Sequence, residues 1–437
     1  MHQCLAWQVM DAQAWRRCLP HPGELFRPTY CIGHGHFRSN GAPVKPDIKP
    51  TVPSISSSLD GTALNPTAIP TSSARRLFLR RSVAAASVTS AVTLASPALA
   101  QTAPTVRWRL ASSFPKSLDT IYGGAEVLSK RLQDITAGKF QISVHAAGEL
   151  MPAFGVVDAL QNGGIECAHT ASYYFVGKNK TFGFETTLPF GLNQRQQNAW
   201  MYYGGGLQLV RDFLRDYNIV SFPGGNTGVQ MGGWFKREIK TLADLKGLKM
   251  RIPGIGGEVM ARLGVVPQQI AGGEIYQALE KGTIDAAEWV GPYDDEKLGF
   301  YKVANHYYYP GWWESNSMYS FYINAKAWDA LPKDYQAAFS AAAAEANIDM
   351  MAEYDFKNPT ALRRLVGNGV KLHAYSTDIM KAAQEAAFDL YAEEADKNPS
   401  FRKIYDSWLK FRSEIMLWHR FAEQTYANFV LNNPARR

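Results

Sequence analysis

The sequence has few of the residues and motifs that define common enzyme classes. Only Cys167 lies after residue 100, and the three other cysteines lie before it. One cysteine cannot form an internal disulfide, and no Cys/His spacing indicates a zinc site. We find no P-loop, GxGxxG, nucleophile elbow or HExxH motif and no internal repeat. Because catalytic triads form in space rather than in sequence, these absences argue only weakly against catalysis.

Over most of the chain, neither positive nor negative charge is in clear excess. The net charge is +7, but the first hundred residues hold ten Lys/Arg against four Asp/Glu, which leaves +1 for residues 101–437. No nucleic-acid partner is therefore indicated. The length of 437 residues suggests two or more domains. The aromatic share of 12% suits a protein with an aromatic-lined site.

Near the N-terminus, the longest apolar run is too short to span a bilayer. This run, Val83–Leu94, follows RRLFLRR at 75–81 and precedes a small-residue cleavage site ending at Ala100. Residues 75–100 therefore read as a signal peptide. Arg75-Arg76 resembles the twin-arginine export signal, and a general export signal with an incidental arginine pair is the alternative. Residues 1–74 are predicted to be disordered, or to be an over-extended start.

Alternating strand and helix patterns follow the signal. Val106–Ala111, Phe140–Val144 and Ile165–Tyr174 read as strands, with helices at Leu118–Thr136 and Val156–Gln161 between them. Such units predict a parallel sheet with ligands near the carboxyl ends of its strands. One long helix is predicted from Arg195 to Tyr217 and a returning strand at Tyr319–Asn324, and the chain from Pro332 on is predicted to be helical.

The predicted fold is α/β, with two interleaved lobes of the periplasmic-binding-protein type, a hinge and a long C-terminal helix. Residues 105–225 with about 315–365 form the first lobe, and residues 226–314 form the core of the second. Several crossings between lobes are what a hinge requires. Residues 366–437 are predicted to be C-terminal helices that brace the lobes and form a dimer.

The last helix carries an apolar seam at alternating steps of three and four. Its members are Phe401, Ile404, Trp408, Phe411, Ile415, Trp418 and Ala422. This spacing is heptad-like. Two interpretations stay open: a helix that braces both lobes of one chain, and a dimer contact.

Two kinds of binding group stand out in the middle of the chain. Arg251 lies in a short apolar strand before Pro253-Gly254, where its guanidinium could form two parallel hydrogen bonds with a carboxylate; a surface arginine closing a helix is the alternative. Gln230, Glu288 and Glu314 place side-chain oxygens among aromatic residues. Buried carboxylates are costly unless they are paired or bind a metal, and oxygen ligands favour sodium or calcium.

These residues lie in motifs with a specific resemblance. KMRIPG at 249–254, GTIDAAEW at 282–289 and PGWWE at 310–314 resemble the extracytoplasmic solute receptors of TRAP (tripartite ATP-independent periplasmic) transporters. NTGVQMGGWF at 226–235 and the pair Tyr173-Tyr174 look like the branch that binds 2-oxo acids. The resemblance covers about residues 105–431. Ser315-Asn316-Ser317 departs from it, because a less polar continuation is expected there.

The resemblance implies a function and a set of roles. The protein would be a periplasmic receptor, not an enzyme, that binds a small 2-oxo or 2-hydroxy monocarboxylate with a sodium or calcium ion and delivers it to a TRAP membrane permease. Arg251 would bind the carboxylate, and the cation ligands would be Gln230, Glu288, the Trp289 carbonyl and Glu314. Tyr173, Tyr174, Trp289 and Asn226 would line the ligand cleft, and the last helix would form a homodimer.

Two other functions stay open on the sequence. The same cleft could serve a carboxylate sensor subunit that signals to a membrane kinase. A metal-dependent periplasmic enzyme is the third reading, and no motif supports it.

Overall fold

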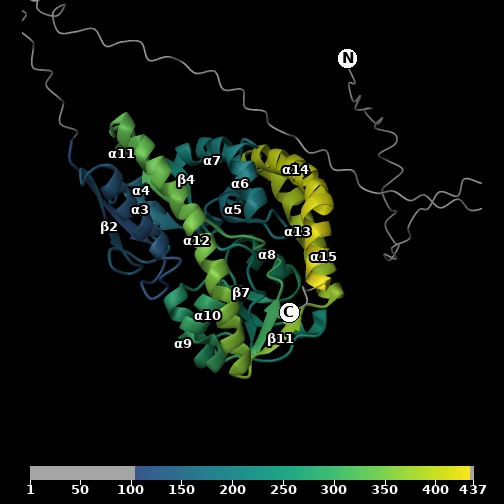
Figure 1. The fold of residues 1–437 in the computed structure, drawn as a ribbon. Coiled ribbons are helices and arrows are strands. Elements are labelled where there is room, and N and C mark those ends of the chain that lie inside the picture. Colours follow the sequence, from purple (N-terminus) through teal and green to yellow (C-terminus); the bar gives the residue numbers. More distant parts are fainter. Residues whose placement is uncertain (1–103, 434–437) are drawn as a thin grey trace, which may run out of the picture. The chain divides into compact units, whose positions relative to one another are not determined.

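The computed structural model describes residues 104–433, whose strands form two sheets (Figure 1). The predicted signal segment and the residues before it lie outside the described part. Within residues 104–433, no helix is both long and apolar enough to cross a membrane.

The first sheet has the strand order β2–β1–β3–β10–β4. Strand β1 pairs in parallel with β2 and β3, as predicted, while β10 returns antiparallel between β3 and β4. Its strands are β1 Val106–Ser112, β2 Phe140–His145, β3 Cys167–Thr170, β4 Ile219–Asn226 and β10 Met318–Asn324.

The second sheet has the order β11–β9–β5–β8–β6–β7. Strand β6 pairs in parallel with β7 and β8, whereas β5 pairs antiparallel with β8 and β9. Its strands are β5 Trp234–Phe235, β6 Lys249–Arg251, β7 Val266–Gln268, β8 Ala286–Ala287, β9 His306–Tyr309 and β11 Lys371–Ala374. Two mixed sheets with many helices confirm the predicted fold class.

Helices fill the connections between these strands. Helix α3 buries Ala125, Leu128 and Leu132, the apolar positions that its sequence spacing indicated. The α-helices are α3 Gly123–Ile135, α4 Val156–Gln161, α5 Gly183–Thr186, α6 Gln194–Tyr202, α7 Gly206–Leu214, α8 Gly254–Arg262, α9 Ile275–Glu280, α10 Pro292–Leu298, α11 Ala325–Asp329, α12 Lys333–Gly367, α13 Thr377–Lys397, α14 Pro399–His419 and α15 Thr425–Asn432.

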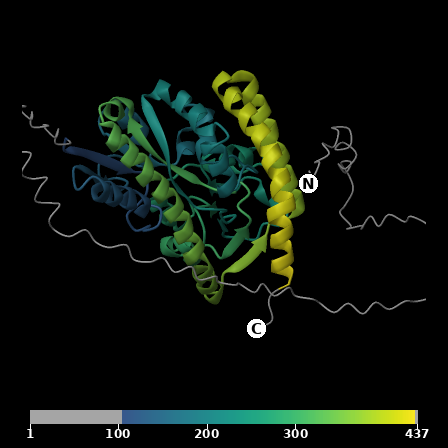
Figure 2. The same ribbon diagram turned by 45° about the horizontal axis from the view of Figure 1, so that its top comes forward.

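Helix α12 packs on parts of both sheets. Its first half buries Phe339 and Ala346 in a core cluster with residues of the first sheet. Farther along, Tyr354 and Leu365 join a larger cluster that includes residues of the second sheet. Figures 1 and 2 show α12 running from the first-sheet side, beside α3, to the second-sheet side, beside α10.

The predicted helix from Arg195 to Tyr217 is wrong as a single element. The structure has α6 and α7, separated at Gly204-Gly205. Gly205, the residue before α7, has a φ of +83°, in the left-handed region, so the chain cannot run on from α6 as one helix. A side chain at Gly206 would meet the Trp200 ring at 2.6 Å, so the turn lets α7 pack on that ring.

Two other predictions need correction. The third strand ends at Thr170 rather than Tyr174, because its neighbours β1 and β10 pair with it only as far as Thr170. Tyr173 and Tyr174 lie instead in the 3₁₀-helix Ser172–Phe175. The chain from Pro332 on is not wholly helical either, because β11 adds an edge strand beside β9.

The last helix is partly buried and partly exposed. Helix α14 continues through a π-helical turn, Arg420–Gln424, into α15 (Figure 2). Phe401, Ile404 and Trp408 pack into the core, as a bracing helix requires. Beyond them, Trp418 is 58% exposed and Phe429 67% exposed. The first part of the seam therefore braces the chain, and the second part has no cover within the described residues.

Candidate carboxylate and cation site

Arg251 and Glu288 form a buried ion pair at the ends of two adjacent strands. Strand β6 ends at Arg251, which pairs with Ala287 of β8, so Glu288 is the next residue on the neighbouring strand. Arg251 is 1% exposed. Its Nε donates to the Ile270 carbonyl at 3.0 Å, and its Nη1 donates to the Glu288 carbonyl at 3.0 Å and to the Glu288 carboxylate. Arg251 is therefore not a surface arginine.

Main-chain hydrogen bonds bring three distant loops to this pair. Gln230 N donates to the Glu314 carbonyl at 3.1 Å, and Met231 N donates to the Val290 carbonyl at 3.0 Å. The loops that carry Gln230, Glu288 and Glu314 are thus fastened together, although up to 84 positions separate them in sequence.

Four buried polar atoms of this cluster have no hydrogen-bond partner among residues 104–433. They are Arg251 Nη2, Glu288 Oε2, Gln230 Oε1 and Glu314 Oε2. Most buried polar groups in proteins are paired, so such a concentration indicates space for a polar ligand. The one nitrogen donor suits an anion, and the three oxygens, from two carboxylates and an amide, suit a hard cation. The donor set therefore fits an anion together with sodium or calcium.

The cation set does not depend on a large acidic cluster. Among residues 104–433, no group of three or more His, Cys, Asp or Glu side chains is placed to hold a metal. The predicted set instead combines two carboxylates with amide and carbonyl oxygens, which calcium and sodium accept.

Burial raises the pKa of both glutamates. The pKa of Glu288 is raised to about 7, chiefly because burial disfavours the charged carboxylate; Arg251 opposes this shift. Burial, and then the nearby charge of Glu288, hold the pKa of Glu314 well above its ordinary value. Two carboxylates that resist ionisation side by side would both ionise readily with a bound cation.

This arrangement predicts how calcium stabilisation depends on pH. Glu288 has a folded-state pKa of about 7 against an ordinary value of 4.5, so its stabilising contribution is full below 4.5 and is lost as pH rises through about 7. Calcium can replace the proton. The rise in Tm on adding calcium is therefore expected to be larger above about pH 7 than below about pH 5, as measured by scanning calorimetry.

The control for this measurement is the protein without calcium. Burial also raises the pKa of Glu185, whose carboxylate is bonded to Ser221 and Tyr322 and not to the predicted cation ligands, so part of the pH slope is independent of calcium. Only the difference between the Tm measured with calcium and the Tm measured without it, at each pH, tests the prediction. A calcium effect equal at all pH values would contradict it.

Aromatic side chains enclose the polar cluster. Tyr173 and Tyr174 are buried, with ring centroids 5.0 Å apart in edge-to-face contact. Burial raises the pKa of Tyr174 to about 12, so its hydroxyl stays a hydrogen-bond donor. The Trp289 ring lies over the Arg251 guanidinium, with 5.0 Å between Cζ and the ring centroid. The structure thus places the Trp289 ring against Arg251, while the role of Tyr173, Tyr174 and Trp289 as the lining of a ligand cleft stays a prediction.

Asn226 has a different setting. Its Nδ2 donates to Asn316 Oδ1 at 3.0 Å, and its Oδ1 accepts from Gly228 N at 2.9 Å. Asn316 Nδ2 in turn donates to the Leu192 carbonyl at 2.7 Å. The polar continuation after Glu314 therefore fastens the turn that leads to Gln230. A direct contact between Asn226 and a ligand stays a prediction.

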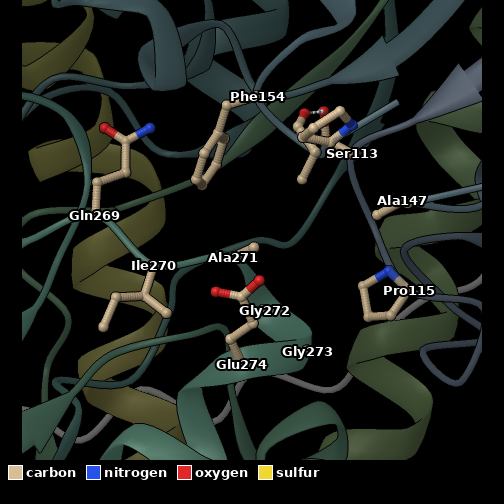
Figure 3. A pocket seen from close by; sticks show the side chains of 13 residues that line it. Ser113, Pro115, Ala147, Phe154, Gln269, Ile270, Ala271, Gly272, Gly273 and Glu274 are labelled. Carbon is tan, nitrogen blue, oxygen red and sulfur yellow. Dashed lines mark hydrogen bonds between the residues drawn. The ribbon is translucent and has the colours of Figure 1, made fainter. Parts of the chain in front are cut away.

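A cavity of about 320 Å³ lies beside the cluster (Figure 3). Phe154, Gln269, Ile270 and Gly272 are among its lining residues, and Arg251, Glu288 and Glu314 are not. Its wall nevertheless touches the site. Ile270 accepts from Arg251, the Phe154 ring centroid lies 5.0 Å from that of Tyr174, and Gln269 Nε2 donates to the Tyr174 carbonyl at 3.1 Å. The cavity and the polar cluster therefore share this wall.

Sequence reasoning missed this wall. The loop 269–274, QIAGGE, carries no charge except Glu274, and Phe154 precedes a short helix with no motif of its own. The glycine pair at 272–273 was the available signal, since adjacent glycines often mark close approach to another group. A Cβ at Gly272 would meet the Trp289 ring at 2.4 Å.

We expect Gly272→Ala to displace Trp289 and weaken binding of a carboxylate ligand by about tenfold, because the added Cβ would overlap the ring and force it to shift. Gly273→Ala is the matched control, since nothing lies within 4 Å of a Cβ there. Calorimetric titration with pyruvate and calcium measures both variants. Equal affinities in the two variants would contradict the place of Trp289 in the site.

Comparison with known proteins agrees with this site. The family model for bacterial extracellular solute-binding proteins of family 7, DctP, matches residues 111–398. The chain therefore belongs to this family, and the predicted identification as a TRAP solute receptor and the predicted periplasmic location are confirmed.

Individual relatives give further detail. The monocarboxylate 2-oxoacid-binding periplasmic protein of Nostoc sp. is 53% identical over 327 residues, which cover 75% of this chain and 90% of that protein. A TRAP transporter solute binding protein from Bordetella bronchiseptica RB50 is 53% identical, with a TM-score of 0.75 over 75% of this chain and 98% of that one; its crystal structure is a mixed-occupancy dimer with copurified calcium and picolinate. A TRAP periplasmic solute binding protein from Pseudoalteromonas atlantica T6c, with bound sodium and pyruvate, is 40% identical, with a TM-score of 0.72 over 74% and 99% of the chains.

Proposed function

We propose that this protein captures a small 2-oxo or 2-hydroxy monocarboxylate, such as pyruvate or lactate, together with a cation, and delivers it to the membrane permease of a TRAP transporter. The observation that carries the proposal is the set of unpartnered buried atoms: Arg251 Nη2, Gln230 Oε1, Glu288 Oε2 and Glu314 Oε2. The ligands of the relatives named above, pyruvate and picolinate with sodium or calcium, are the kind that this set accepts.

The charges of the site favour a divalent cation. Arg251 supplies one positive charge, and Glu288, Glu314 and a monocarboxylate supply three negative charges. Calcium would balance these charges, whereas sodium would leave one negative charge in a buried site. We therefore propose that calcium competes seriously with sodium. Gln230, the two glutamates and the Trp289 carbonyl would hold the ion, which would also contact the ligand.

A titration of the chelated protein tests the proposal. We expect pyruvate to bind when calcium or sodium is present, with calcium giving the higher affinity. Acetate, which has the carboxylate but lacks the 2-oxo group, is the ligand control and should bind more weakly. Binding of neither pyruvate nor lactate with either ion would overturn the proposed ligand class. Binding supported by sodium alone would overturn the preference for calcium.

We propose that the receptor carries its ligand unchanged. The family consists of solute-binding proteins, and the unpartnered atoms of the polar centre suit the binding of an anion and a cation. Pyruvate recovered after long incubation with the calcium-loaded protein should be unaltered by mass spectrometry. A modified product would favour the enzyme reading instead.

Closure of two lobes would complete capture. We propose residues 105–225 with about 315–365 as one lobe and residues 226–314 as the core of the other, with α12 among the connections. The predicted ligand groups come from both: Tyr173 and Tyr174 from the first lobe, and Arg251 and Glu288 from the second. Closing the lobes would therefore exclude water from the ligand.

A homodimer through the last helix is also part of the proposal. Phe421 is 65% exposed and Phe429 is 67% exposed, so the end of the helix carries large apolar side chains without cover in the described residues. Phe421→Glu combined with Phe429→Glu should yield monomers in light scattering, whereas the wild type is dimeric. Lys410→Glu is a charge-changing control on the same helix. A wild type that is monomeric at all concentrations would contradict the dimer.

A further inference from the structure

A buried carboxylate outside the predicted ligand set holds the Trp289 ring. Asp294 is fully buried in the first turn of α10. Its Oδ2 accepts from Trp289 Nε1 at 3.3 Å and from the Tyr354 hydroxyl at 2.7 Å. The indole N–H is the only hydrogen-bond donor of the tryptophan side chain, so this bond restrains how the ring can turn.

The ring that Asp294 holds is in contact with two parts of the site. It lies over the Arg251 guanidinium, and it packs closely on Gly272 in the wall of the cavity. The main-chain carbonyl of Trp289 is also one of the proposed cation ligands. A turn of this ring would therefore change both the anion side and the cavity side of the site.

The second partner of Asp294 comes from a distant element. Tyr354 is fully buried in α12, the helix that packs on parts of both sheets. One turn later, Asn358 Oδ1 accepts from Tyr293 N at 3.0 Å. The first turn of α10 is thus fastened to α12 by two hydrogen bonds, one of which ends on the carboxylate that holds Trp289.

We propose that Asp294 is a positioning residue for the ligand site: it holds Trp289 against Arg251 through the indole N–H, and Tyr354 keeps the carboxylate in place from α12. Asp294 need not touch the ligand. The inference rests on the proposed function, because it assumes that Trp289 is a wall of a carboxylate site.

The neighbouring aspartate supplies a matched control. Asp295 Oδ2 accepts from the Tyr307 hydroxyl, also at 2.7 Å, and from Trp234 Nε1 at 2.9 Å. Tyr307 and Tyr354 are both fully buried. Tyr307→Phe and Tyr354→Phe therefore each remove a tyrosine hydrogen bond from one of two adjacent carboxylates. Only Tyr354→Phe removes it from Asp294, the carboxylate that holds Trp289.

The experiment compares these two variants in the full protein with calcium present. Both should lower Tm by similar amounts. Only Tyr354→Phe should weaken pyruvate binding, by about tenfold, which is the factor for one lost hydrogen bond to a charged group. The indole N–H signal of Trp289, assigned by Trp289→Phe, should shift in Tyr354→Phe and stay in place in Tyr307→Phe. Asp294→Asn should shift the same signal, since an amide oxygen is a weaker acceptor than a carboxylate.

The positioning role would be overturned if the two tyrosine variants bound pyruvate equally and the indole signal did not move. The proposed function would then still stand, provided that the wild type binds pyruvate. Failure of the calcium-loaded wild type to bind pyruvate would overturn both.

Discussion

Arg251→Lys is expected to weaken pyruvate binding by about a hundredfold, because the ligand loses charge-assisted hydrogen bonds that an ammonium cannot replace. In the structure, Nε binds the Ile270 carbonyl and Nη1 binds Glu288, which leaves Nη2 for the ligand. A lysine would carry the positive charge, but its ammonium group could not bind the Ile270 carbonyl, Glu288 and the ligand at the same time in this geometry. Calorimetric titration with pyruvate in excess calcium measures the loss.

The ion pair changes what truncation of Arg251 should do to stability. Without the Arg251 side chain, Glu288 would stay buried without its partner. Arg251→Met is therefore expected to lower the free energy of unfolding by about 3–5 kcal/mol. The double variant Arg251→Met with Glu288→Gln should regain much of this loss and still fail to bind pyruvate. Pyruvate affinity retained in the folded double variant would remove Arg251 from the site.

Glu314→Gln is expected to lower calcium affinity by about a hundredfold, because a charged oxygen ligand is lost from a buried site. Glu288→Gln should act in the same direction. Pyruvate affinity should fall with calcium affinity in both variants and recover in part at high calcium, since the ion and the ligand share the site. Titration with calcium and then with pyruvate separates the two effects.

Glu185→Gln is the matched control for these variants. Glu185 is as deeply buried as Glu288 and also has a pKa raised by burial, but it is bonded to Ser221 and Tyr322 beside the first sheet. This substitution should change stability and leave calcium and pyruvate affinity unaltered. If Glu185→Gln and Glu314→Gln weakened calcium binding equally, a general loss of stability would explain the effect and the cation site would be wrong.

Much of the fold could be predicted because its signals are local. The apolar spacing of α3, the alternation in β1 and the pattern of β10 each follow from a few adjacent residues. The misassigned elements depend on distant contacts. The break between α6 and α7 is set by packing of Gly206 on Trp200, and β3 ends where its neighbouring strands stop pairing with it.

The site shows the same division. Arg251, Gln230, Glu288 and Glu314 could be selected because each is a polar residue in an apolar or aromatic setting within a recognisable motif. Their surroundings could not be predicted, since the contact of Ile270 with Arg251 and the hold of Asp294 and Tyr354 on Trp289 arise only from tertiary packing. Asn226 shows a further role that its motif did not indicate, because its side chain fastens a turn, while a ligand contact stays a prediction.

The central claim about this site is that Arg251 and a cation bind the carboxylate together. The most direct measurement is a calorimetric titration of pyruvate into the chelated protein, repeated after calcium is restored. Pyruvate affinity is expected to fall by at least about fiftyfold without the cation and to return with it. Without the cation, Arg251 alone would balance the charge of a buried monocarboxylate beside Glu288 and Glu314. Equal pyruvate affinity with and without cations would contradict joint binding of the carboxylate by Arg251 and a cation.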